Sequence, residues 1–266
     1  MDRMMVAVFD TETNAFQATK ALHALDDDGT ISIYALAVIV KDGAGKVSVK
    51  QSAESGPLGT AVGLLSGSLI GLVAGPVGFA IAVGAGALGG IVYDLAKIGV
   101  DEDFLNEAGK ALTPGKSAVV FEAWEDWVTP IDASVEELGG VVFRRVRGEV
   151  LDAQIARDAE TVKAELASLE AEYAAAAQNL RAKLDGKIAT AKAKLRATQE
   201  LARRELDAAK QETEAKVKTL RAKQAKVHDA RKAKLETRIG EVQAEYKRRG
   251  DKLLQAWELT KQALAV

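Results

Sequence analysis

The sequence predicts an α+β fold: a ferredoxin-like sandwich with an inserted glycine-zipper hydrophobic helical hairpin, followed by a long α-helical coiled coil. Three observations support this fold class. Short apolar, β-branched runs alternate with helical patterns in residues 1–54 and 94–148. Residues 55–93 contain no charged side chain. Residues 149–266 contain no proline and are rich in Ala, Lys, Arg, Glu and Leu, which favours uninterrupted helix.

The sandwich is predicted from eight segments of residues 1–54 and 94–148. Five apolar runs are typical of strands, and three segments with apolar residues near helical spacing are typical of helices. The strands are expected at 4–9, 31–40, 47–51, 117–122 and 141–146, and the helices at 13–25, 101–111 and 130–138. The resulting order, β-α-β-β-α-β-α-β, favours a ferredoxin-like domain with one additional strand and one additional helix.

The inserted segment, residues 55–93, is predicted to be a glycine-zipper hairpin that forms a membrane or oligomer core. Glycine costs about 1 kcal/mol relative to alanine inside a helix, so a regular row of glycines needs a reason. Small residues every fourth position let a second helix backbone approach closely. Each arm would have roughly 17 residues, or about 26 Å of helix, which is slightly short of a bilayer core. The packing residues are Gly59, Gly63, Gly67, Gly71 and Gly75 on the first arm, and Ala82, Gly86 and Gly90 on the second.

Residues 149–266 are predicted to form the coiled coil. Apolar side chains recur in alternating steps of four and three, which is the spacing of a coiled-coil seam. The first such run is Val162, Leu166, Leu169, Tyr173, Ala176 and Leu180. One long helix and a helical hairpin both fit this pattern. The candidate bends are Asp185-Gly186 and the apolar-poor stretch 226–234.

Charge is distributed unevenly along the chain. Residues 1–148 carry a net charge of −8 and residues 149–266 one of +6. The most basic stretch, 181–238, could bind nucleic acid or anionic lipid headgroups. Alternatively, the acidic residues of 149–172 could pair with it inside the coiled coil. Aromatic residues are missing from 174–245, which disfavours stacking on bases.

No residue pattern predicts catalytic, cofactor-binding or metal-binding residues. Cysteine is absent, which excludes disulfides and thiolate ligands. The two histidines, His23 and His228, lie in different halves of the chain and fit no triad or metal-ligand spacing. The stretch Gly109–Ser117 resembles a P-loop, but it has one residue too many and a predicted helix before it instead of a strand. We therefore expect a protein that is not an enzyme and needs no cofactor.

Several motifs in one order link residues 1–148 to a known family. They are Val6–Asp10, Lys41–Val47, the glycine-rich block, Ile98–Phe104, Leu112–Ala118 and Leu138–Arg144. With these motifs the segment resembles a bacterial "predicted membrane protein" family, domain of unknown function 1269. The resemblance implies a membrane or membrane-proximal protein of no established activity, and it assigns no catalytic residue. The helical extension departs from the minimal family pattern, so its role does not follow from the resemblance.

The sequence therefore favours a non-enzymatic, membrane-associated scaffold that self-assembles. We expect it to contact its own copies and membrane lipid, and its coiled coil to be a spacer or a protein-binding arm. The alternatives are a soluble homo-oligomer with the hairpin buried between subunits, or a nucleic-acid-associated coiled coil. The first residues lack the features of a signal peptide, so we expect the cytoplasmic face of the cell membrane, or the cytoplasm in the soluble alternative.

Overall fold

The computed structural model describes residues 2–74, 99–147 and 150–265, which fold into two compact units. The first unit contains Met1–Gly148 and Ala215–Ile239. The second contains Glu149–Glu214 and Gly240–Val266. The first unit is built on a sheet, and the second consists of helices.

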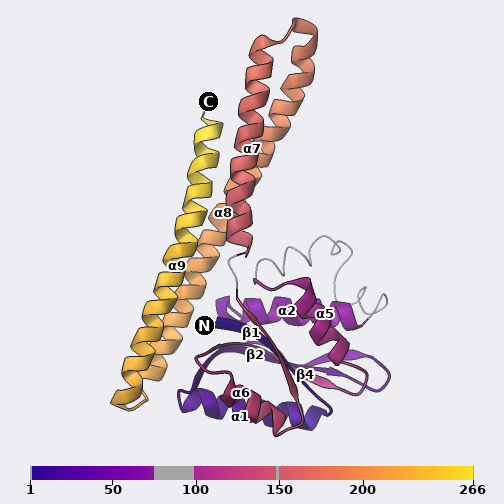
Figure 1. Ribbon diagram of the computed structural model, residues 1–266, viewed down its shortest axis with the longest axis vertical. Helices are drawn as coiled ribbons and strands as arrows, with labels where there is room; N and C mark the ends of the chain where they lie inside the picture. Colours follow the sequence, from indigo (N-terminus) through magenta and orange to yellow (C-terminus); the bar gives the residue numbers. More distant parts are fainter. Residues whose placement is uncertain (1, 75–98, 148–149, 266) are drawn as a thin grey trace. The chain divides into compact units, whose positions relative to one another are not determined.

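The first unit has a five-stranded antiparallel sheet with helices on both faces (Figure 1). The strands lie in the order β3-β2-β4-β1-β5, and every neighbouring pair is antiparallel. Helices α1 and α6 cover one face, and α2 and α5 cover the other. The strands are β1 (Asp2–Phe9), β2 (Ile31–Lys41), β3 (Val47–Gln51), β4 (Ser117–Glu125) and β5 (Val141–Val146); the helices are α1 (Glu12–Asp27), α2 (Pro57–Val73), α5 (Glu102–Ala111) and α6 (Thr129–Glu136).

The continuous apolar runs of the sequence reflect burial on both faces of the sheet. Side chains alternate between the two faces along a strand. On β1, Met4, Val6 and Val8 therefore join the core under α2 and α5, whereas Met5 and Phe9 join the core under α1 and α6. The structure confirms the mixed α/β composition and the long C-terminal helices that the sequence predicts.

Helix α2 is the described part of the predicted apolar hairpin, and it lies on the sheet. It starts at Pro57, where the missing N–H of proline is tolerated, and it ends at the Ala74 cap. Three of its larger side chains, Val62, Leu65 and Leu69, are fully buried in the core against the strands, whereas Leu72 is exposed. The predicted turn after α2 and the second arm lie outside the described residues.

Three long helices follow the sheet domain. They form the second unit, except that the end of α8 and the start of α9 belong to the first unit. The helices are α7 (Val150–Ala175), α8 (Gln178–Gln224) and α9 (Asp229–Leu264). Apolar side chains of all three helices form two buried clusters in the second unit. One cluster includes Leu151, Ile155, Ala202, Leu253 and Ala256; the other includes Leu166, Leu169, Leu184, Ala191 and Leu195.

The helices break at two places, one of which the sequence indicated. The break between α8 and α9, at residues 225–228, overlaps the predicted bend at 226–234. The other predicted bend, Asp185-Gly186, is wrong, because α8 continues through it. The chain instead bends after α7, where the Arg181 Nε donates a hydrogen bond to the Ala176 carbonyl at 3.2 Å. One glycine costs about 1 kcal/mol in a helix, which packing along a 47-residue helix can offset.

Candidate functional site

The first-arm glycines of the predicted zipper have different surroundings on α2. Gly59 and Gly71 are buried, whereas Gly63 and Gly67 are exposed. A Cβ atom added at Gly63 or Gly67 would have no atom of the described residues within 4 Å. Gly75, Ala82, Gly86 and Gly90 lie outside the described residues. The structure thus brings Gly59, Gly63 and Gly67 together along one side of α2, and we call these three residues the glycine ridge.

Gly59 allows the backbone of residues 53–54 to cross α2 at close range. A Cβ atom at this position would lie 1.8 Å from the Glu54 carbonyl oxygen, which is closer than atoms can approach. Gly56, with a φ of 124°, reverses the chain immediately before α2 in a conformation that favours glycine. These two glycines hold the segment between β3 and α2 over the start of the helix.

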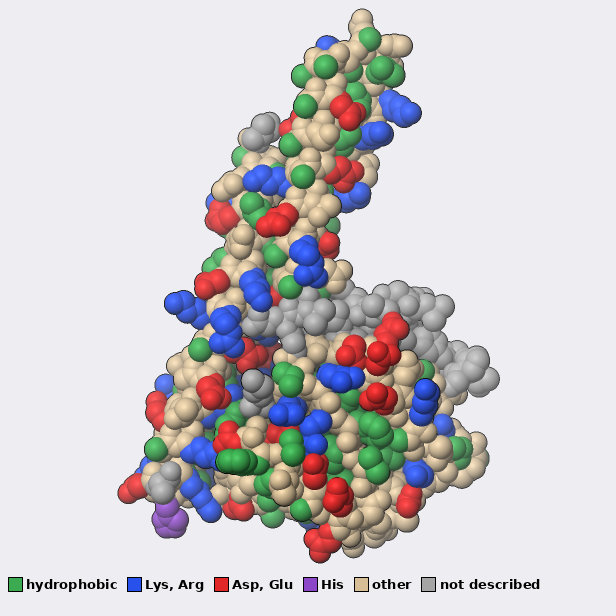
Figure 2. Space-filling model, viewed as in Figure 1, with side chains coloured by type: hydrophobic (Ala, Val, Ile, Leu, Met, Phe, Trp, Pro, Cys, Tyr) green, Lys and Arg blue, Asp and Glu red, His purple; other side chains and the backbone are tan. Residues whose placement is uncertain are grey.

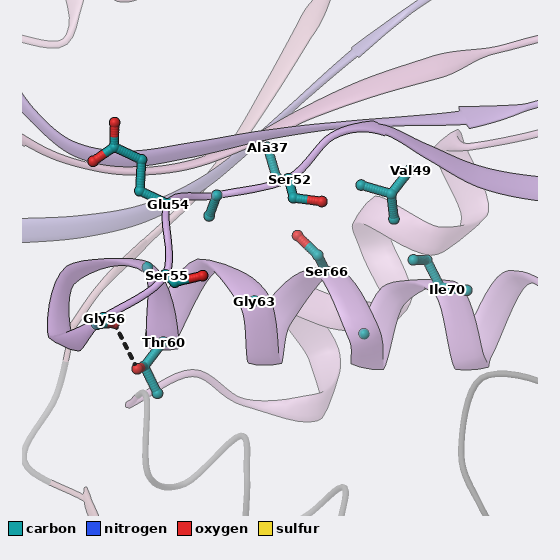
Figure 3. A pocket seen from close by; sticks show the side chains of 13 residues that line it. Ala37, Val49, Ser52, Glu54, Ser55, Gly56, Thr60, Gly63, Ser66 and Ile70 are labelled. Atoms are coloured by element: carbon teal, nitrogen blue, oxygen red, sulfur yellow. Dashed lines mark hydrogen bonds between the residues drawn. The ribbon is translucent and has the colours of Figure 1, made fainter.

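The glycine ridge lines an open pocket between α2, the β2-β3 edge of the sheet and residues 52–56 (Figure 3). Its volume is about 510 Å³. Most lining groups are small or apolar, and four carry hydroxyls. Glu54 is the one charged side chain among the lining residues, which are Ala37, Val49, Ser52, Ala53, Glu54, Ser55, Gly56, Gly59, Thr60, Gly63, Ser66, Gly67 and Ile70.

Ser66 is the buried polar group of this pocket. Its side chain points from α2 toward the space beneath β3 (Figure 3), and the residue is 6% exposed. The Ser66 Oγ has no hydrogen-bond partner among the described residues. By contrast, the Thr60 hydroxyl donates a hydrogen bond to the Gly56 carbonyl at 3.0 Å. A buried hydroxyl without a partner costs about 1–3 kcal/mol, so Ser66 needs an explanation.

A second polar site lies where residues 215–239, at the α8-α9 turn, meet the sheet. The Lys216 Nζ donates hydrogen bonds to Glu122 Oε1 at 2.7 Å and to Asp2 Oδ2 at 3.0 Å. All three side chains are at most 4% exposed. Arg147 Nη1 donates to the same Glu122 oxygen at 3.0 Å. Buried charges are tolerated when they are paired in this way.

Aromatic side chains complete this ionic cluster. Arg238 donates through Nη2 to Asp2 and through Nε to the Tyr34 hydroxyl, the latter at 3.1 Å. The Lys216 Nζ lies 4.7 Å from the centre of the Tyr34 ring, and the Arg238 guanidinium lies 5.2 Å from that of Trp124. No sequence pattern predicted this cluster. The sequence shows Lys216 and Arg238 only as two basic residues of a predicted coiled coil. Basic residues are also expected on the surface of a coiled coil, so they did not indicate a buried cluster.

Glu125, near the end of β4, is a buried carboxylate with a shifted pKa. Its Oε1 lies 3.2 Å from Arg3 Nε and 3.3 Å from Arg144 Nε. Burial raises the pKa of Glu125 above its ordinary value, and the attraction of Arg144 and Arg3 offsets this only in part. Glu125 therefore holds its proton to a higher pH in the folded chain than in the unfolded chain.

Two lysines of the basic stretch face carboxylates within the second unit. Lys192 lies 3.2 Å from Glu170 and Lys194 lies 3.7 Å from Glu165, so lysines of α8 face carboxylates of α7. Figure 2 shows basic and acidic side chains interspersed along the helices. Such pairs fit the alternative in which the acidic residues of 149–172 face the basic stretch inside the coiled coil.

The stretch Gly109–Ser117, which resembles a P-loop in sequence, does not have the structure of one. The P-loop-like stretch has α5 before it and β4 after it, which is the reverse of the order in a P-loop. Its Lys116 Nζ lies 3.0 Å from Asp10 Oδ1.

Within the described ranges, no group of three His, Asp or Glu residues is arranged to hold a metal ion. None of the helices there combines the length and the apolarity that crossing a bilayer requires.

These features define an α+β domain with an uncharged, glycine-lined helix on its sheet and a long helical extension. Residues 60–161 match the model of the family described as "Protein of unknown function (DUF1269)", which confirms the resemblance of this part of the chain to that family. The match runs from α2 into α7 and includes most of the glycine-rich block and the three motifs that follow it. No curated protein and no solved structure matches the chain.

Proposed function

We propose that this protein is a non-enzymatic, membrane-associated scaffold that self-assembles, with the glycine ridge of α2 as its apolar contact surface. In this proposal the core of β1, α1, β2, β4, α6 and β5 is ferredoxin-like, which the strand order β2-β4-β1-β5 supports. The long helices serve as a spacer or a protein-binding arm on the cytoplasmic face of the membrane.

The observation that carries this proposal is the open space at Gly63 and Gly67. Both glycines weaken α2, yet neither is required by a contact within the described residues. A row of small residues on an uncharged helix suits close approach by an apolar partner, either lipid chains or another helix. The family resemblance favours the membrane as the place where this occurs.

Replacing Gly67 with leucine tests the proposal. The leucine would occupy the open side of α2 and hold the partner away, so Gly67→Leu should reduce both flotation with liposomes and oligomer mass. Gly186→Leu is the matched control, because Gly186 is also a helical glycine with no atom near its Cβ position. Equal flotation and equal mass for both variants would exclude the glycine ridge as the contact surface.

A soluble homo-oligomer is the second candidate. The ridge repeats every four residues, so it is complementary to a second copy of itself. A carbonate wash of the membrane fraction distinguishes the two candidates. The oligomer should remain intact without detergent and stay in the supernatant after a carbonate wash, whereas the membrane-associated scaffold should remain with the membrane.

A further inference from the structure

We propose that the pocket beside the glycine ridge binds a single-chain lipid with an uncharged, hydroxyl-bearing head, of the monoacylglycerol class. This inference deepens the proposed function, on which it rests, by naming the lipid that α2 contacts. It stands on two independent observations: the open, small-residue pocket, and the buried Ser66 hydroxyl that points into it and has no partner in the part of the chain that the structure describes.

The shape and lining of the pocket favour an aliphatic chain. Its volume of about 510 Å³ lies within the usual range of small-molecule sites. Gly63 and Gly67 offer bare backbone on one side, and Val49 and Ile70 supply aliphatic groups at one end (Figure 3). The described lining residues include no aromatic side chain on which a flat ring could stack.

The polar groups of the pocket favour an uncharged head. Glu54, Ser55 and Thr60 lie at the end of the pocket opposite Ile70 (Figure 3). The lining residues include no cation, and the Glu54 carboxylate would repel an anionic head. A glycerol head carries hydroxyls that can exchange hydrogen bonds with Ser55.

Ser66 lies between these two ends and would recognise the linkage between head and chain. Its Oγ–H can donate to an ester carbonyl oxygen, which satisfies the hydroxyl that has no partner in the pocket. A saturated hydrocarbon offers no such acceptor. The chemistry therefore selects an ester-linked amphiphile over a simple alkane.

The experiment is calorimetric titration of the purified, delipidated full-length chain with mono-octanoylglycerol, and with octanoate and glycerol as comparison probes. The native chain should bind one mono-octanoylglycerol, and bind octanoate at least about tenfold more weakly because of Glu54. Glycerol should give no measurable binding. Absence of binding up to the solubility limit, which means that only water fills the pocket, or equal affinity for octanoate, would overturn the proposal.

Three variants locate the site. Gly63→Leu should abolish binding by filling the pocket, whereas Gly186→Leu should leave it unchanged. Ser66→Ala should weaken binding about fivefold through the loss of one hydrogen bond. Its unfolding temperature should stay the same or rise, because a buried hydroxyl without a partner is removed. Unchanged binding by Gly63→Leu, or unchanged binding with a lower unfolding temperature for Ser66→Ala, would contradict this site.

Failure of this inference can be told apart from failure of the proposed function. A chain that floats with liposomes but does not bind mono-octanoylglycerol keeps the scaffold function and loses the lipid site. A chain that binds the probe but neither floats nor assembles keeps the site and loses the scaffold function.

Discussion

At the scale of single residues, Gly59 and Gly67 lie on the same side of one helix and respond to different constraints. Gly59 is enclosed by the backbone carbonyl of Glu54, whereas Gly67 has none of the described residues against its Cβ position. The sequence could show their regular spacing but not this difference, because the crossing segment is placed by the turn that follows β3. Spacing alone therefore assigned one role to both residues.

We expect opposite effects from the same substitution at these positions. Gly59→Ala should lower the free energy of unfolding by about 2 kcal/mol, because the new methyl group collides with a carbonyl oxygen and overpacking outweighs the gain in helix propensity. Gly67→Ala should raise it by up to about 1 kcal/mol. Urea unfolding followed by circular dichroism measures both. Stabilisation by Gly59→Ala would show that residues 53–54 do not cross α2 as described.

Glu125 gives the chain a defined dependence of stability on pH. Its pKa is raised in the folded chain. As the pH rises above about 4.5, the unfolded chain therefore loses the Glu125 proton while the folded chain still holds it. The folded state then binds more protons than the unfolded state, and stability must fall as the pH rises from 4.5 through the raised pKa. Above that pKa the loss is complete and constant.

Glu125→Gln should remove this contribution, because glutamine resembles the protonated acid. The variant and the native chain should have similar stability near pH 4, and the variant should become relatively more stable toward pH 7. Urea unfolding of both chains at several pH values provides the comparison, and taking the difference cancels carboxylates common to both. A difference that stays constant with pH would contradict a raised pKa.

At the scale of elements, the α8-α9 turn is fixed to the sheet by buried charge. Lys216 bridges Asp2 and Glu122, and its removal would leave these two carboxylates buried with less positive charge. Lys216→Met should therefore lower the free energy of unfolding by about 3 kcal/mol. Lys218→Met, an exposed position two residues further along α8, should change it by less than about 0.5 kcal/mol. Similar small effects of both variants would show that residues 215–239 do not pack on the sheet.

The sequence predicted elements more successfully than it predicted contacts between them. Strands β1, β2 and β4 were recognisable because burial on both faces leaves continuous apolar runs, and that of β2 is followed immediately by a short turn. The predicted coiled-coil seam described the packing of the helices less well. Arg249 falls at a seam position, and its Nε lies 2.6 Å from the buried Asp152, a partner about a hundred residues away. No local pattern reveals such a pair.

The pocket could be predicted only in part for a related reason. The glycine spacing and the lack of charge in α2 identified the helix surface. However, the other side of the pocket comes from Ala37, Val49 and residues 52–56, whose position depends on how β3 pairs with β2. Ser66 appeared in the sequence only as one hydroxyl within an apolar segment, and its burial becomes evident once α2 lies on the sheet.

At the scale of the whole molecule, the compact units do not follow the boundary at residues 148–149 that composition suggests. The first unit includes residues 215–239, which supply Lys216 and Arg238 to the ionic cluster. A fragment of residues 1–148 contains all five strands but lacks these cations. In that fragment Asp2 and Glu122 lose buried partners, and Trp124 loses the guanidinium and ammonium groups above its ring.

We therefore expect residues 1–148 alone to unfold at a lower temperature than the sheet domain of the full chain. Adding residues 149–266 in trans should restore part of the loss, because this fragment supplies the missing cations. The second fragment contains both apolar clusters of α7, α8 and α9, so it should be helical on its own. Differential scanning calorimetry of each fragment, of the mixture and of the full chain tests this, with circular dichroism for the helices. If residues 1–148 unfold at the same temperature with and without their partner fragment, the contact of residues 215–239 contributes nothing to the fold, and composition marks the true boundary.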